Sequence, residues 1–198
     1  MHRVLFTSLD AAIAGLILAP VFYFLNIKYI HNRLRSTLYC IFAIYHCAIF
    51  AVAGLPDIRY IRFNPHINLK LFAYMFSDAT SSLLNVLLFI PMGIFLPILW
   101  KDYHPLQKTL LFGFFTSLFV ETLQIFTLRA TEVNDLLTNT TGTILGWCCV
   151  HWFLAISKRN SGTNSKKEPF IIWFIVFIVM FLIHPYLSEV LYPYFTNI

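Results

Sequence analysis

Long apolar runs, separated by short charged clusters, limit how this chain can fold more than any other feature of the sequence. A membrane-spanning helix needs about 20 consecutive, mostly apolar residues, and several runs reach that length. Only 12% of the 198 residues are charged, whereas a soluble domain usually carries about twice that fraction. The sequence therefore predicts an all-α, polytopic membrane helical bundle in which residues 1–198 form a single membrane domain.

Six segments between flanking charges are long enough to predict about six transmembrane helices. They lie between Asp10 and Lys28, Arg35 and Asp57, Asp78 and Lys101, Lys108 and Arg129, Asp135 and Lys158, and Glu168 and Glu189. The first, third and fifth loops carry nine of the 14 Lys and Arg residues, and the other loops and the termini carry five. Because cytoplasmic loops are enriched in Lys and Arg, we expect these three loops inside and both termini outside.

The two longest loops differ in character. Residues 55–80 alternate polar and apolar side chains and contain two prolines, which favours an interfacial segment or a re-entrant loop. Residues 157–169 are polar and contain Gly and Ser, so they predict a flexible cytoplasmic linker.

Charge and motifs narrow the classes of function. The net charge of +5 arises mainly in the predicted cytoplasmic loops, where basic residues face anionic lipid. We therefore expect membrane lipids as partners and no nucleic acid. The sequence contains no His-Glu-x-x-His, no Cys-x-x-Cys, no phosphate-binding Gly loop and no dinucleotide fingerprint, so it predicts neither a metal site nor a cofactor.

Acids and amides gather at one predicted depth in this otherwise apolar chain. In the predicted topology Asn85, the pair Glu121 and Gln124, and the pair Asp135 and Asn139 all fall in the outer halves of three successive spans. Glu121 and Gln124 are three residues apart and share a helix face. A carboxylate in the hydrocarbon region costs at least about 2.5–3.5 kcal/mol, so Glu121 needs a proton, a partner or a wet cleft.

Small residues and a proline indicate how these three spans pack. Gly142 and Gly146 lie on the face that carries Asp135 and Asn139, and their spacing lets a neighbouring helix approach closely. Pro91 removes a helix hydrogen bond, and Gly93 leaves room beside it. The pattern predicts a cavity walled by the third, fourth and fifth spans.

Two interpretations of the polar cluster remain open. Arg129, with Arg59 and Arg62 as alternatives, is the expected partner of Glu121. A buried ion pair or amide network that only locks the helices together is one interpretation, since membrane helices use Asn and Gln in this way. A functional cleft is the other, because ionisable residues inside a membrane usually mark a functional site.

The order and spacing of these motifs resemble a known family. The motifs are Asn85-x-x-Leu-Phe-Ile-Pro91-Met-Gly93, Glu121-x-x-Gln124, Arg129 and Asp135-x-x-x-Asn139-x-x-Gly142. Together they resemble the VanZ-like family over residues 56–156, which we take as its core. That family is named for a membrane protein associated with teicoplanin resistance, so the resemblance implies a bacterial inner-membrane protein linked to the cell envelope.

Three functions fit the cluster. In the first, an outer-leaflet cleft binds a lipid-linked envelope precursor or a lipoglycopeptide, and its headgroup contacts are Asn85, Gln124, Arg129 and Asn139. In the second, a membrane enzyme uses Glu121 and Asp135 as an acid/base pair. In the third, the chain is a small transporter or flippase, although it lacks the internal repeat that such proteins often have.

Overall fold

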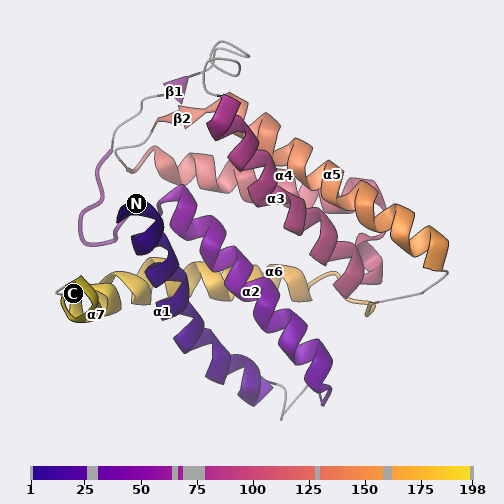
Figure 1. Ribbon diagram of the computed structural model, residues 1–198, viewed down its shortest axis with the longest axis horizontal. Helices are drawn as coiled ribbons and strands as arrows, with labels where there is room; N and C mark the ends of the chain where they lie inside the picture. Colours follow the sequence, from indigo (N-terminus) through magenta and orange to yellow (C-terminus); the bar gives the residue numbers. More distant parts are fainter. Residues whose placement is uncertain are drawn as a thin grey trace. The chain divides into compact units, whose positions relative to one another are not determined.

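The computed structural model describes residues 2–25, 31–63, 67–68, 79–127, 130–157 and 162–196 (Figure 1). The helices are α1 (His2–Leu25), α2 (Arg33–Ala53), α3 (Ala79–Leu99), the short 3-10 helix η2 (Lys101–Tyr103), α4 (Leu106–Gln124), α5 (Val133–Ser157), α6 (Glu168–Ile178), the π-helical segment η3 (Val179–Ile183) and α7 (His184–Thr196). Two strands of two residues each, β1 (Ile67–Asn68) and β2 (Thr131–Glu132), complete the described structure. The prediction of an all-α bundle is confirmed.

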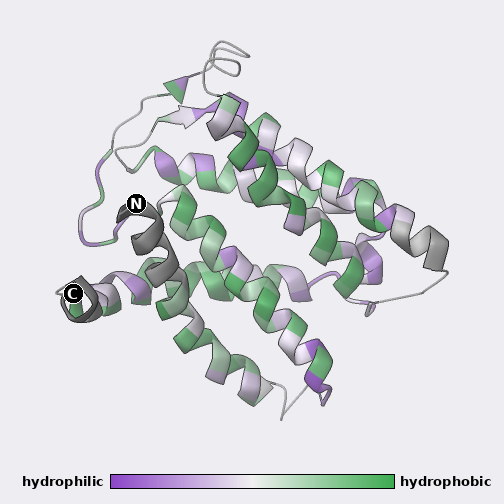
Figure 2. Cartoon of the chain, in the orientation of Figure 1, coloured by the Kyte–Doolittle hydropathy of each residue, from purple (hydrophilic) through white to green (hydrophobic). Residues whose placement is uncertain are grey.

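Among the described residues, three helical stretches are long and apolar enough to cross a membrane, namely Arg33–Ala53, Ala79–Leu99 and Glu168–Val190. The stretch Ala12–Phe24 is a shorter apolar helix. Figure 2 shows hydrophobic residues along most of α2 and α3, and more hydrophilic ones at the end of α4 that leads to β2. Gly, Ser, Thr, Glu and Gln lower the mean hydropathy of α4, so the number of six crossings stays a prediction.

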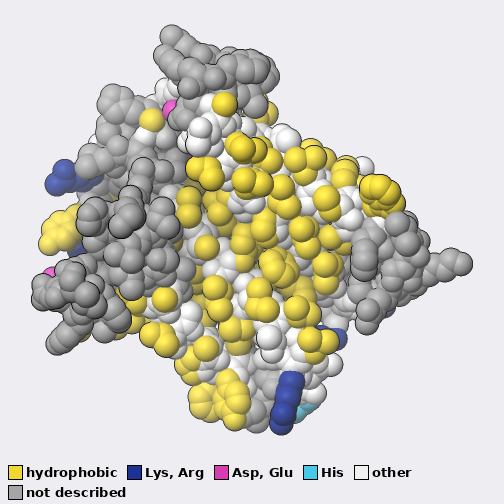
Figure 3. All heavy atoms as spheres, viewed as in Figure 1, with side chains coloured by type: hydrophobic (Ala, Val, Ile, Leu, Met, Phe, Trp, Pro, Cys, Tyr) yellow, Lys and Arg dark blue, Asp and Glu magenta, His cyan; other side chains and the backbone are white. Residues whose placement is uncertain are grey.

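Large apolar side chains nevertheless cover the outward faces of the less hydrophobic helices. On α4, Leu111, Phe115 and Leu118 are exposed, while Gly113, Ser117, Glu121 and Gln124 are buried. Among the residues that are coloured in Figure 3, the side chains on the face drawn are mostly hydrophobic. An apolar exterior around a partly polar interior suits a lipid environment, because lipid hydrates no polar group.

The chain divides into two compact units. Unit one comprises residues 1–62 and 169–198, and unit two comprises residues 63–168. In unit one, α1 packs along α2, and the buried Ser36 hydroxyl donates a 3.1 Å hydrogen bond to the Phe22 carbonyl. Helix α6 contacts α2 through aromatic rings, with Phe50 lying 5.9 Å from Trp173 and 6.1 Å from Phe177 between ring centroids.

In unit one, an ionic cluster connects the segment that follows α2 to α7. The Arg59 guanidinium donates from Nε to Asp57 Oδ1 at 2.9 Å and from Nη2 to Asp57 Oδ2 at 2.6 Å, and it also pairs with Glu189 of α7. The same guanidinium lies 5.6 Å from the ring centroids of Tyr60 and Tyr186. The hydrogen bond from Arg59 lowers the pKa of Asp57 below its ordinary value, because a charged donor favours the ionised carboxyl.

Unit two is organised by a parallel pair of helices, α3 and α5. A side chain at Gly142 would collide with the Val86 carbonyl, and one at Gly146 with the Ile90 carbonyl. Residue numbers on the two helices rise together along this contact, so α3 and α5 run in the same direction. Their backbones meet directly, as the spacing of Gly142 and Gly146 predicts for a small-residue contact.

Gly93 lies against the same partner helix. A side chain there would collide with the Thr143 carbonyl and the Trp147 amide of α5. Helix α3 continues without a break through Pro91 to Leu99. The room that Gly93 leaves is therefore occupied by the α5 backbone.

The loop that precedes α6 is docked onto the end of α3. The Thr163 amide donates to the Leu99 carbonyl at 3.0 Å, and the Lys101 amide donates to the Thr163 carbonyl at 2.9 Å. The indole of the fully buried Trp100 donates to Glu168 Oε2 at 2.7 Å. The prediction of a flexible linker is therefore wrong for residues 162–168, because the backbone after α3 supplies partners that composition does not reveal.

Replacing Gly146 with Ala should destabilise the protein by about 1–3 kcal/mol, the usual cost of overpacking a closed contact. Gly15→Ala is the matched control, since its new methyl group would meet only Ile44 Cγ1 at an ordinary 3.9 Å. That control should be neutral or stabilising by about 0.5–1 kcal/mol. Thermal unfolding in detergent measures both variants, and equal behaviour would contradict the close α3–α5 contact.

Replacing Asp57 with Asn should lower the unfolding temperature at pH 6, because it removes the charge that Arg59 binds. The folded pKa of Asp57 is lowered, so its contribution is present above the unfolded pKa of about 3.9 and is lost as the pH falls through the folded value. The two proteins should therefore converge in acid. Asp102→Asn is the control, because Asp102 makes only a 3.9 Å ion pair with Lys108; a similar loss there would argue against the cluster.

Candidate functional site

A row of small and polar residues forms the contact between α4 and α5 in unit two, and we call it the polar seam. Its members are Gly113, Ser117, Glu121 and Gln124 of α4, Glu132 of β2, and Asn139 and Thr143 of α5. The α4 members recur every three or four residues and so share one face. Gly113 meets Thr143, Ser117 meets Asn139, and Glu121 meets Glu132. Residue numbers rise on α4 as they fall on α5, so these helices are antiparallel.

Glu121 holds the connection between α4 and α5 in place. Its side chain is only 5% exposed, and its Oε2 accepts a 3.0 Å hydrogen bond from the Glu132 amide. The Thr131 hydroxyl donates to the Glu121 carbonyl at 3.1 Å. Strand β2 is also paired in parallel with β1, with Ile67 opposite Thr131. Glu121 is thus a buried carboxyl that binds backbone, which reduces the cost of burying it.

Asn139 is the second buried polar group of the seam. It is 5% exposed, and its Nδ2 donates to the hydroxyl of the fully buried Ser117 at 2.9 Å. Its buried Oδ1 accepts no hydrogen bond from the described residues. Exchanging the amide O and N would leave the other end of the group without a partner instead. A buried amide needs both ends satisfied, so Asn139 has hydrogen-bonding capacity to offer a ligand.

The remaining predicted site residues lie at the same end of unit two. Gln124 is 6% exposed, and Asp135 is half-buried in the first turn of α5. Asn85 of α3 is also half-buried, and it directly precedes Val86, whose carbonyl faces Gly142. Helix direction alone therefore brings the three polar groups to one end, because α3 and α5 start there and α4 finishes there.

The arginines expected near Glu121 have different outcomes. Arg129 lies outside the described residues, so its pairing with Glu121 stays a prediction. Arg59, one of the two alternative partners, binds Asp57 and Glu189 in unit one. Among the described residues, no group of three His, Cys, Asp or Glu side chains lies close enough together to hold a metal ion.

Sequence reasoning missed the hydroxyl residues of this region. Ser117 and Thr143 are fully buried, and Thr138 is 1% exposed with its hydroxyl donating to the Asn134 carbonyl at 3.1 Å. Thr143 donates to the Asn139 carbonyl, also at 3.1 Å. Ser and Thr are common inside membrane helices, so composition did not single out these residues. Their spacing was the usable signal, because Ser117 precedes Glu121 by four residues and Thr143 follows Asn139 by four.

The chain is similar in sequence to known proteins. The family model described as VanZ/LLP1 matches residues 13–155, which extends beyond the predicted core of 56–156 into α1 and α2. "Protein VanZ" of Enterococcus faecium is 33% identical over 103 residues, covering 52% of this chain and 60% of that protein. The chain thus spans about three fifths of the curated relative's length. No solved structure matches the chain.

Proposed function

Because this chain belongs to the VanZ/LLP1 family, as its motifs suggested, we propose that it is a membrane protein of the bacterial cell envelope that binds a lipid-linked or lipid-tailed molecule at the polar seam. The family's association with teicoplanin resistance suggests the chemistry of that molecule. Either a lipoglycopeptide or the lipid-linked envelope precursor on which such a drug acts would combine a polar headgroup with an apolar tail. The protein would then have a role in glycopeptide resistance.

The observation that carries this proposal is the Asn139 amide. It is buried against Ser117, one helical turn from Glu121, and retains one end without a hydrogen bond from the described residues. In a membrane interior a polar group that only locks helices should be fully satisfied, because no water is available to complete it. A buried amide with spare hydrogen-bonding capacity, one helical turn from a buried carboxyl, is better explained by a ligand that supplies the missing contact.

The surroundings support the two-part chemistry of the ligand. Asn85 and Asp135 are half-buried at the same end of unit two, so a headgroup can reach them before it reaches the seam. Leu84 and Leu87, which lie within two residues of Asn85 on α3, are exposed and offer an apolar surface of the kind that suits a lipid tail. Gln124 and Arg129 complete the proposed headgroup contacts.

The proposed site faces the outer leaflet of the inner membrane. The support is the excess of Lys and Arg in the first, third and fifth loops, which favours an outer location for the β2 connection. In a variant lacking the four native cysteines, a cysteine at position 132 should react with a membrane-impermeant thiol reagent in intact cells, and one at position 162 should not. The reverse labelling would overturn the orientation.

Replacing Glu121 with Gln tests the proposed function. A Gln side chain keeps an oxygen that can accept the Glu132 amide, so the fold should survive while the negative charge is lost. We expect the variant to reach the membrane at normal levels but to weaken teicoplanin resistance and ligand binding by roughly tenfold, which corresponds to about 1.4 kcal/mol. Teicoplanin susceptibility and binding of labelled teicoplanin or lipid-linked precursor are the measurements.

Two controls separate the alternatives. Thr141→Ala removes an exposed hydroxyl of α5 that donates to the Leu137 carbonyl of its own helix, and it should change nothing. Glu121→Ala removes the acceptor itself and should speed amide hydrogen exchange in residues 130–134. Full resistance in Glu121→Gln would show that Glu121 merely anchors β2. Lost resistance with unchanged binding would favour the membrane-enzyme alternative, in which Glu121 and Asp135 act as an acid/base pair.

A further inference from the structure

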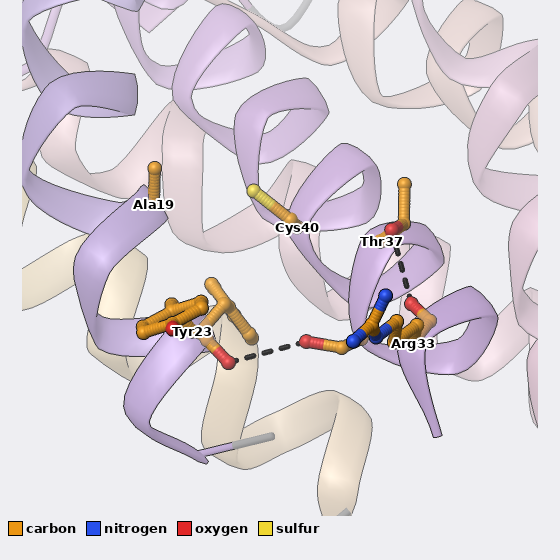
Figure 4. A pocket seen from close by; sticks show the side chains of 7 residues that line it. Ala19, Tyr23, Arg33, Thr37 and Cys40 are labelled. Atoms are coloured by element: carbon orange, nitrogen blue, oxygen red, sulfur yellow. Dashed lines mark hydrogen bonds between the residues drawn. The ribbon is translucent and has the colours of Figure 1, made fainter. Parts of the chain in front are cut away.

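A cavity of about 570 Å³ opens between α1 and α2 in unit one, far in sequence from the polar seam. Figure 4 shows Ala19 and Cys40 at one end of it and Tyr23 and Arg33 at the other. Its volume falls within the range of about 300–1,000 Å³ that is usual for small-molecule pockets.

The two ends of the cavity differ in chemistry. Arg33 is the first residue of α2, and Cys40 lies seven residues further along, which is about 10 Å in a helix. Ala19 and the buried Phe22 of α1 line the wall together with Cys40. The cavity therefore runs from a cationic end at the start of α2 to an apolar end about two turns further along that helix. An amphiphile with an anionic head matches this profile, whereas a small anion would use only one end.

Arg33 is the principal hydrogen-bond donor that the cavity offers to an anion. The Ser36 hydroxyl donates to the Phe22 carbonyl at 3.1 Å, and the Thr37 hydroxyl donates to the Arg33 carbonyl at 3.0 Å, as the dashed lines in Figure 4 mark. Both hydroxyl protons are thus used inside the protein. The exposed guanidinium of Arg33 keeps its five N–H donors in a planar fork that suits a phosphate.

The charge of Arg33 has no acidic partner among the described residues. Within the described part of the chain, no acidic side chain lies within ion-pair distance of it. The sequence between Asp10 and Asp57 contains Lys28, Arg33 and Arg35 and no acidic residue. A basic pocket between membrane helices, at the level of the lipid headgroups, is a known type of site for anionic lipids.

We propose that this cavity binds one anionic phospholipid, with its phosphate on Arg33 and an acyl chain against Ala19, Phe22 and Cys40. The Tyr23 ring forms the side wall at headgroup level. The lipid would fill the space between α1 and α2, so it is a bound component of unit one and separate from any ligand of the polar seam.

Native mass spectrometry of the full chain in detergent tests this proposal, with phosphatidylglycerol or phosphatidylcholine added as the probe. The unchanged protein should retain one phosphatidylglycerol and much less phosphatidylcholine. Arg33→Gln should reduce retained phosphatidylglycerol by roughly tenfold, consistent with the loss of a charged hydrogen-bond partner. Arg35→Gln is the matched control, because Arg35 carries the same charge two residues away but does not line the cavity; it should bind nearly as the unchanged protein does.

A second variant tests the apolar end. Ala19→Phe fills that end without touching Arg33, and it should also reduce retained phosphatidylglycerol. Equal losses in Arg33→Gln and Arg35→Gln would overturn the proposal in favour of diffuse attraction between lipid and protein. If inorganic phosphate displaces the lipid and Ala19→Phe retains phosphatidylglycerol normally, the cavity binds only an anion. That result would overturn the proposed acyl-chain contact. Equal retention of phosphatidylglycerol and phosphatidylcholine would overturn the claim that the cavity selects an anionic lipid.

Discussion

The direct meeting of the α3 and α5 backbones is the contact on which the rest of unit two depends. Gly93, Gly142 and Gly146 leave no space for side chains between the two helices. Lipid tails are as apolar as Leu, so burial of apolar surface drives helix association only weakly in a membrane, and close van der Waals packing matters more. Once α3 and α5 are joined in parallel, α4 must run antiparallel to both, and its end meets their beginnings. The polar residues share one depth for that reason.

The same helix, α5, serves two partners with two different chemistries. Gly142 and Gly146 face α3, where shape alone makes the contact, while Asn139 and Thr143 face α4, where Asn139 also donates a hydrogen bond to Ser117. A rigid contact on one side holds the polar groups on the other side in place. This arrangement suits a binding site, because a preorganised group loses little conformational freedom when a ligand arrives.

Much of this could be predicted from the sequence, and the failures have physical causes. Helix positions followed from apolar run lengths, and the roles of Gly142 and Gly146 followed from spacing, since a missing side chain has few uses inside a membrane helix. The anchor role of Glu121 could not be foreseen, because its partner is a backbone amide, which every residue possesses. The docking of residues 162–168 onto α3 could not be predicted for the same reason, because Thr163 forms these hydrogen bonds through its main chain. Arg129 lies outside the described residues and remains untested.

Because α3 and α5 are separated by α4 in the sequence, their contact can form only some time after α3 has been synthesised. Gly146 is translated about 50 residues after Gly93, which takes about 3–10 s at the usual rates of chain elongation. During that interval the rest of α3 and all of α4 are made, but the α5 residues that cover Gly93 and hydrogen-bond Ser117 are still missing. The newly made chain must therefore keep these surfaces out of wrong contacts until α5 arrives. Slow translation just after α4 would lengthen the exposure, so expression yield should depend on codon choice between residues 125 and 146.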